Sequence, residues 1–131
     1  MKKSKAKARR FINHLYNKYD VPRIPIYIHW HHTSVITESG VLGFGVFMYG
    51  DDVETAIHIS GKKIKTTGVL SVIAHEFTHY LQYLHGRDMS DTEQIEYDAE
   101  NFGTALFGGW LLEGKKWEPL PAWKCWKQEG K

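Results

Sequence analysis

The stretch "IAHEFTHYLQYLH", at positions 73–85, constrains the fold of this chain more than any other part of it. Apolar residues recur through residues 66–85 at helical spacing, and Gly86 stands where a helix would end. His75 and His79 are four residues apart, so on a helix both imidazoles project from one face, about 6 Å apart along the axis. Two imidazoles at this separation can bind one metal ion without distortion of the backbone. The stretch therefore predicts a helix with a metal-binding face.

Glu76 follows the first histidine and lies roughly 100° further round the predicted helix. A carboxylate in that position is poorly placed to bind the ion, but it can accept a proton from a water molecule beside the ion. His75, Glu76 and His79 thus form the pattern H-E-x-x-H, in which one helix supplies two zinc ligands and a general base. The alternative interpretation is a helix that carries ordinary surface histidines.

A catalytic zinc site needs a third protein ligand, and the sequence offers two places for it. His85 has the spacing of the last histidine in H-E-x-x-H-x-x-G-x-x-H, but Gln82 replaces the glycine that lets the chain leave the helix there. Glu96 and Glu100 are four residues apart on the next predicted helix, where Gly103 on the same face permits close helix packing. One carboxylate can complete a His₂Glu site and the other can hydrogen-bond a liganding histidine. The alternative is that both are solvated helix acids.

Apolar periodicity and turn residues predict an α+β domain around this pair of helices. The predicted elements are, in order, a helix at residues 5–19, strands at 24–30, 41–49 and 55–60, a helix at 66–85 and a helix at about 90–112. The second and third strands are predicted to form a hairpin, and residues 90–93 fit an S-x-x-E capping box at the start of the last helix. We expect a single domain over residues 1–131, with its core at about 24–112.

The segments "HEFTHYLQ" and "EYDAENFG" together resemble the H-E-x-x-H and E-x-x-A-[ND]-x-F-A elements of small gluzincin metallopeptidases, such as the HtpX-type and ImmA/IrrE-type enzymes. The resemblance implies a minimal zincin, with an N-terminal helix, a small twisted and mostly antiparallel sheet, an active-site helix, a second helix and an irregular tail. In such a domain His75, His79 and Glu96 would hold Zn²⁺ and Glu76 would be the catalytic base. Glu100 stands where the family usually has Asp or Asn, so it is expected beside a liganding histidine or as an alternative ligand.

The resemblance also implies the activity of a zinc metalloendopeptidase, which hydrolyses peptide bonds with a zinc-activated water and acts on a protein or peptide substrate. Such enzymes usually bind the substrate backbone along an edge strand. We expect that edge to be the segment of Thr55, Ala56, Ile57, His58 and Ile59. Candidates by residue type for stabilising the oxyanion are Tyr80, Tyr97, Arg87 and His58.

Charge and composition leave one other class of function open. The net charge is only +2, but residues 1–23 hold eight Lys or Arg against one acid, which favours a solvated helix face or an acidic partner. The alternative function is therefore a non-catalytic zinc-binding module, or one that contacts nucleic acid or protein through its basic ends. No apolar run approaches the roughly 18 residues of a membrane span, so no membrane partner is expected. A single cysteine predicts a cytoplasmic protein without an internal disulfide, and the small size is similar to that of phage proteins.

Two further stretches invite a functional interpretation. In "HWHH", His29 and His31 would share one face of a strand, but no acid or cysteine lies nearby in the sequence to complete a metal site. We therefore interpret this stretch as a cluster at the surface end of a strand. The tail carries Trp117, Trp123 and Trp126, which we interpret as rings that cover a small core rather than as a platform for nucleobases.

Overall fold

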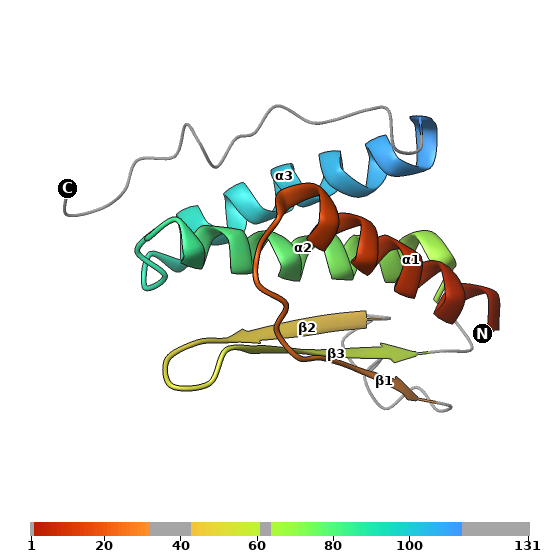
Figure 1. Ribbon diagram of the computed structural model, residues 1–131, viewed down its shortest axis with the longest axis horizontal. Coiled ribbons are helices and arrows are strands. Elements are labelled where there is room, and N and C mark those ends of the chain that lie inside the picture. The colour runs from red at the N-terminus through yellow and green to blue at the C-terminus, as the bar shows by residue number, and fades with distance from the viewer. Residues whose placement is uncertain (1, 32–42, 61–63, 114–131) are drawn as a thin grey trace. The chain divides into compact units, whose positions relative to one another are not determined.

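The computed structural model describes residues 2–31, 43–60 and 64–113 of the chain (Figure 1). The elements are α1 (Lys2–Tyr19), β1 (Ile26–His31), β2 (Gly43–Met48), β3 (Glu54–Ser60), α2 (Thr66–Leu84) and α3 (Thr92–Glu113). The predicted α+β class and the predicted order of elements are confirmed, while the expected irregular tail lies outside the described residues. The chain divides into two compact units, residues 1–73 and 74–131, and the expectation of a single domain stays a prediction.

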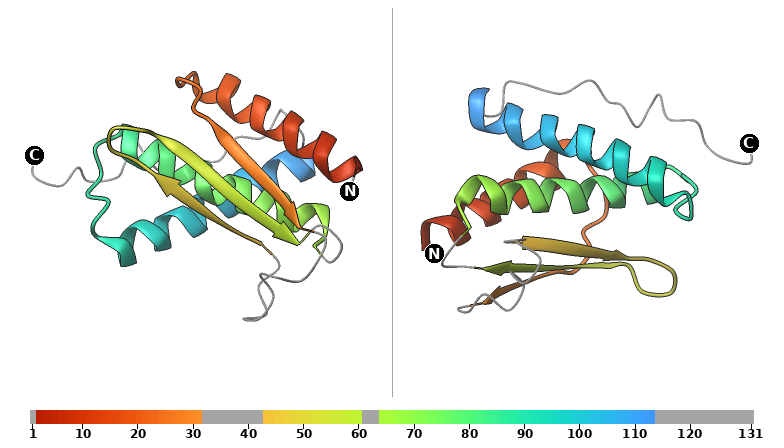
Figure 2. Two further views of the ribbon diagram at one scale, coloured as in Figure 1. Left: turned by 90° about the horizontal axis from the view of Figure 1, so that it is seen from below. Right: turned by 180° about the vertical axis from the view of Figure 1, so that it is seen from behind.

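The first unit contains a three-stranded mixed sheet in which β3 lies between β1 and β2 (Figure 2, left). The predicted hairpin is confirmed, because β2 and β3 pair antiparallel. Strand β1 pairs with β3 in parallel, so the sheet is not mostly antiparallel as expected. The physical reason is that β1 pairs with the edge of β3 that lies away from β2. It does not pair with β2, the strand that follows it in the chain.

The predicted substrate-binding edge is wrong. Thr55, Ala56, Ile57, His58 and Ile59 belong to β3, whose register with β1 and with β2 pairs its backbone on both sides. Backbone N–H and C=O groups that are already bonded to two neighbouring strands cannot accept an added strand. In the part of the chain that the structure describes, the edges of this sheet are β1 and β2.

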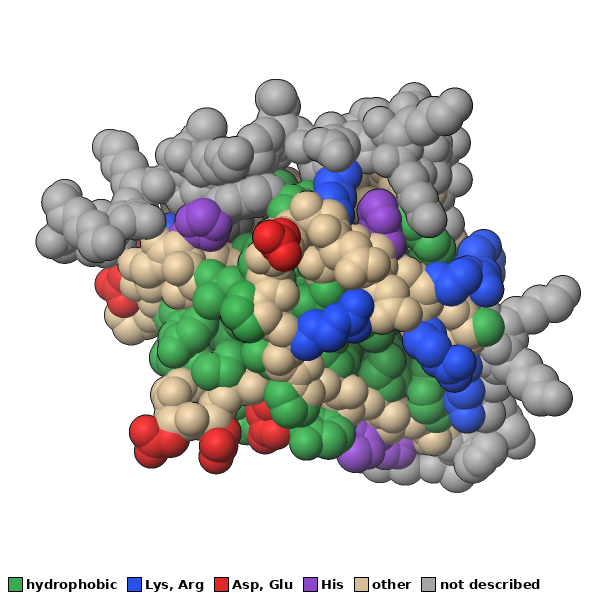
Figure 3. All heavy atoms as spheres, in the orientation of Figure 1, with side chains coloured by type: hydrophobic (Ala, Val, Ile, Leu, Met, Phe, Trp, Pro, Cys, Tyr) green, Lys and Arg blue, Asp and Glu red, His purple; other side chains and the backbone are tan. Residues whose placement is uncertain are grey.

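The two faces of the sheet carry different side chains, because side chains alternate along each strand. Ile57 and Ile59 are buried on one face, where Ile59 pairs with Trp30. The ammonium of Lys5 lies 5.6 Å from the Trp30 ring centroid, so α1 lies over this face. Helix α1 contributes to the core the buried residues Ala8, Phe11, Leu15 and Tyr16, at the predicted helical spacing. The side chains of Lys5, Arg9 and Arg10 are exposed, and blue side chains gather over α1 in Figure 3.

The second unit begins inside α2, and the end of that helix is fixed by a glycine in the left-handed region. Gly86 has φ +74, and its N–H donates to the Tyr83 carbonyl while the N–H of Arg87 donates to the Gln82 carbonyl. This pair of hydrogen bonds is the Schellman motif, in which a glycine satisfies carbonyls that the helix leaves without partners. The predicted stop at Gly86 is therefore confirmed.

Helix α3 turns back along α2 and is held there by polar and apolar contacts within the second unit. The buried guanidinium of Arg87 donates to Asp98 Oδ2 at 2.9 Å. Helix α3 begins at Thr92, and the Ser90 hydroxyl donates to Asp88 Oδ1 in place of the predicted capping-box contact. The apolar face of α3 is buried as its sequence predicts, through Ile95, Ala99, Phe102 and Leu106.

Close packing of the two helices depends on Gly103. A Cβ at this position would lie 3.1 Å from the backbone N and Cα of His75, so only a glycine lets α3 approach the backbone of α2 so closely. None of the helices within the described residues is long and apolar enough to cross a membrane.

We expect Gly103→Ala to lower the free energy of unfolding by about 1–3 kcal/mol, because the added methyl group meets backbone atoms that cannot rotate away. Gly108→Ala is the matched control in the same helix, since a Cβ there meets nothing within 4 Å and alanine gains up to about 1 kcal/mol of helix propensity. Urea unfolding of both variants checks the prediction. Equal stabilisation by both substitutions would contradict the prediction, because it would show that the close packing of α3 on α2 does not depend on Gly103.

Candidate metal site

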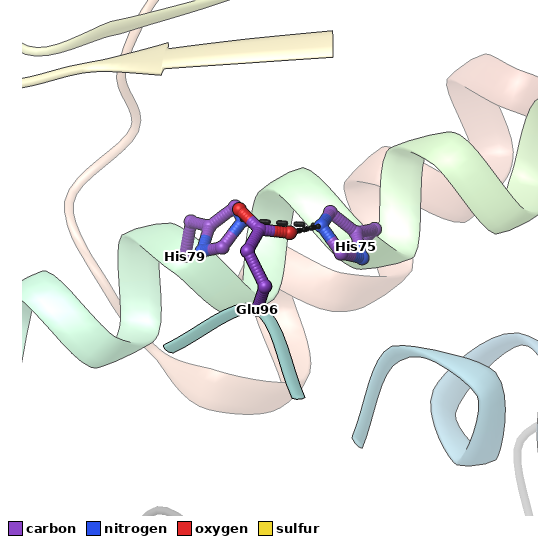
Figure 4. A group of neighbouring side chains, drawn as sticks. All are labelled: His75, His79 and Glu96. Carbon is purple, nitrogen blue, oxygen red and sulfur yellow. Dashed lines mark hydrogen bonds and ion pairs between the residues drawn. The ribbon is translucent and has the colours of Figure 1, made fainter. Parts of the chain in front are cut away.

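His75, His79 and Glu96 converge between α2 and α3 (Figure 4). His75 Nε2 lies 2.8 Å from Glu96 Oε2, and His79 Nε2 lies 3.0 Å from Glu96 Oε1. The two Nε2 atoms are 3.1 Å apart, and the rings meet nearly edge to face, at an interplanar angle of 86°. One ligand atom from each residue lies within 4.8 Å of the others, so this group could hold a metal ion.

Gln82 fixes the proton position on His79. This side chain is fully buried, and its Nε2 donates to the Ile95 carbonyl at 3.0 Å. Because a carbonyl can only accept, the amide oxygen of Gln82 must face the other way, where it lies 2.8 Å from His79 Nδ1. An amide oxygen also only accepts, so the ring proton of His79 is on Nδ1 and its Nε2 presents a lone pair.

The converging atoms have more lone pairs than protons. Burial lowers the pKa of His79, which keeps this ring neutral, so its Nε2 and the Glu96 carboxylate are both acceptors at 3.0 Å. A single proton on His75 Nε2 can serve only one of its two contacts, to Glu96 Oε2 or to His79 Nε2. A cation placed among the three residues satisfies every lone pair at once. Ligand atoms bound at about 2.0–2.2 Å in a tetrahedral site lie roughly 3.3 Å apart, which is close to the observed distances.

Glu100 lies on the other side of His75. Its Oε2 is 3.3 Å from His75 Nδ1, which is the position expected for a carboxylate that orients a liganding imidazole. Glu100 is not part of the converging group, which takes Glu96 as its acid. The structure thus brings both predicted glutamates to His75, on opposite nitrogens of the ring.

Glu76 is buried beside the group without belonging to it. Its Oε2 lies 3.9 Å from His75 Nε2. Burial raises the pKa of Glu76 to about 7, against the opposing effect of His75 and with a further increase from Glu96. A carboxyl group with a pKa near neutrality can both accept and release a proton, which suits a general base.

The other candidates of the sequence analysis lie elsewhere. His85 donates its backbone N–H to the Leu81 carbonyl, which continues the helical hydrogen bonding, and it is not part of the converging group. Arg87 is bound to Asp98, Tyr97 is exposed and Tyr80 is buried, and their role as oxyanion candidates stays a prediction. The sequence analysis considered Gln82 only as the residue in place of a glycine. A polar residue three positions after a liganding histidine, inside an apolar helix, is the signal that identifies it.

Comparison with known families, curated proteins and solved structures finds no match for this chain.

We expect Gln82→Met to weaken metal binding about 10–100-fold, because the His79 ring loses the acceptor that fixes its orientation. Thr78→Val is the matched control, since it removes a buried hydrogen bond to the Ala74 carbonyl on the same helix without touching a ligand. Titration with Co²⁺, followed by its visible absorption, measures both affinities. Imidazole nitrogen NMR of the metal-free protein should also show the His79 proton leaving Nδ1 in Gln82→Met only. An equal loss of affinity in both variants would assign the effect to stability alone.

We expect metal-free Glu76→Gln to be more stable than the wild type at pH 8, by roughly 3 kcal/mol, and the difference to shrink towards pH 5. The pKa of Glu76 is raised from 4.5 when unfolded to about 7 when folded, so the folded protein holds the proton in this window and the unfolded chain releases it. Wild-type stability therefore falls as the pH rises from 4.5 to 7, and glutamine removes this loss. Urea unfolding at several pH values, with exposed Glu93→Gln as the control, measures the difference. A difference that does not vary with pH would contradict the prediction.

Proposed function

We propose that this protein is a zinc-dependent endopeptidase, in which His75, His79 and Glu96 hold the zinc ion and Glu76 is the general base. The observation that carries the proposal is the convergence of two imidazoles and one carboxylate with too few protons between them, next to a buried carboxyl group. The same residues carry the resemblance of the sequence to gluzincin metallopeptidases of the ImmA/IrrE type and HtpX type.

The donor set favours zinc over other common metal ions. Two imidazole nitrogens and one carboxylate oxygen are typical of hydrolytic zinc sites, whereas magnesium and calcium prefer oxygen ligands alone. When bound, zinc would lower the pKa of a coordinated water and polarise the scissile carbonyl.

The number of ligands favours a catalytic over a structural site. Structural zinc sites are usually closed by four protein ligands, whereas this group offers three among the described residues, which fits a site with a position for water or substrate. A structural site also has no need of a base, and the buried Glu76 is otherwise an unfavourable residue at this position.

The side chains of this site would have separate roles in hydrolysis. Glu76 would take a proton from the attacking water and deliver it to the leaving amine, for which a pKa near neutrality suits both steps. Gln82 and Glu100 hold the rings of His79 and His75 so that both Nε2 atoms face Glu96. The proposed substrate is a protein or peptide, and the single cysteine of the chain fits the proposed cytoplasmic setting.

We expect Glu96→Ala to hold about one zinc ion per chain fewer than the wild type, because it removes one of three ligands, while His85→Ala holds as many as the wild type. Glu76→Gln should keep its zinc and lose at least 10²-fold in the rate of cleavage of an unfolded protein substrate such as casein. Metal analysis and a fluorescent cleavage assay on the same preparations measure the two effects.

Full cleavage by Glu76→Gln would exclude the proposed mechanism. Stoichiometric zinc together with no cleavage by the wild type would instead favour the non-catalytic module. Salt-dependent DNA binding through the Lys and Arg residues of α1 then becomes the next measurement.

A further inference from the structure

We propose that the sheet carries a second transition-metal site, independent of the first, with His31 and His58 as its first two ligands and His29 as its third. The site lies in the unit of residues 1–73, whereas every residue of the peptidase proposal lies in the unit of residues 74–131. The proposal therefore does not rest on the proposed function.

Parallel pairing of β1 with β3 brings the three histidines together. His29 pairs directly with His58, and His31 lies two residues further along β1, so all three side chains point from the same face of the sheet. This is the face opposite Ile57 and Ile59, and we call it the histidine face. The sequence analysis found no third ligand near "HWHH" because His58 lies 27 residues after His31.

Two of the rings already hold their nitrogens at the separation of a chelating pair. His31 Nε2 lies 3.1 Å from His58 Nδ1, and both side chains are half-buried. Two imidazole nitrogens bound to one ion at about 2.0–2.1 Å, with an angle of 90–110° between them, lie roughly 2.9–3.4 Å apart. The ring centroids are 5.3 Å apart and the two nitrogens face each other, so each ring must turn about its χ angles for both lone pairs to meet on one ion.

His29 is placed to become the third ligand. Its ring is stacked on that of His58, with centroids 4.7 Å apart and an interplanar angle of 14°, and lies 6.5 Å from the ring of His31. A stacked ring does not yet aim a nitrogen at the pair. The His29 side chain is exposed, so rotation about its χ angles can turn it towards the ion without displacing core residues.

The surroundings decide which ions this site would take. The register places Phe44 directly opposite His58, with the rings 5.0 Å apart, and Val46 and Met48 follow Phe44 on the same face of β2. A set of imidazole ligands suits Cu²⁺, Ni²⁺ and Zn²⁺, whereas Mg²⁺ and Ca²⁺ prefer oxygen ligands.

The test removes the first site and asks what remains. Untagged protein that carries His79→Ala and Glu96→Ala is titrated with Cu²⁺ and with Zn²⁺ by calorimetry. We expect about one ion per chain, with loss of this binding when His31→Ala and His58→Ala are added. His29→Ala should weaken the binding by about tenfold, and His85→Ala, which removes a histidine outside the cluster, should leave it unchanged.

Electron paramagnetic resonance of the Cu²⁺ form provides a readout that a change in stability would not produce. Hyperfine splitting from two or three imidazole nitrogens supports the site, and its loss in the more conservative His31→Gln and His58→Gln variants assigns those nitrogens. Absence of binding once the first site is removed, or binding that survives removal of His31 and His58, would overturn the proposal. Neither result would affect the peptidase proposal, because its zinc content and cleavage are measured on variants that keep the histidine face intact.

Discussion

The second unit depends on one contact where α2 meets α3, in which His79 Nε2 and the Glu96 carboxylate are both acceptors and have no proton between them. His79 is neutral and donates its ring proton from Nδ1 to Gln82. The lone pair on its Nε2 therefore faces a lone pair of the Glu96 carboxylate. Such a contact is unfavourable between two acceptors and favourable once a cation lies between them. Among the polar groups nearby, Gln82 and Glu100 orient the converging atoms. Glu76 has a pKa near neutrality, at which a carboxyl group can accept and release a proton. The contacts of this unit thus favour a bound cation at one particular place.

The residues of the converging group could largely be predicted from the sequence because most of their geometry is local. His75, Glu76 and His79 lie within five residues, and the helix period alone decides which of them share a face. Glu96 required one more inference, that two helices joined by a short turn at Gly86 lie side by side, and Gly103 supported it. The turn, the glycine and the spacing of the carboxylates all agree, which is why this part of the prediction matches the structure.

The predictions that failed, and the contacts that were missed, depend on tertiary neighbours. The sheet was expected to be mostly antiparallel with residues 55–59 at an edge, but β1 pairs with β3 in parallel, and this makes β3 the central strand. The contact of His31 with His58 arises from the same pairing and has no local signal. The spacing of Gln82 from His79 is a local signal, but the orientation of its amide is fixed only by the Ile95 carbonyl, which the sequence does not place beside it.

The hydrogen bond from Gln82 to the Ile95 carbonyl joins the two helices through the residue that holds His79. The imidazole, the amide and the first turn of α3 therefore form one continuous chain of contacts, which a bound ion would extend. Energy gained by loading such a site is also energy that orders the start of α3, since the unfolded chain holds no preformed site. Under the proposed function, the cellular supply of metal would decide how long each copy of the protein survives proteolysis, as well as whether it is active.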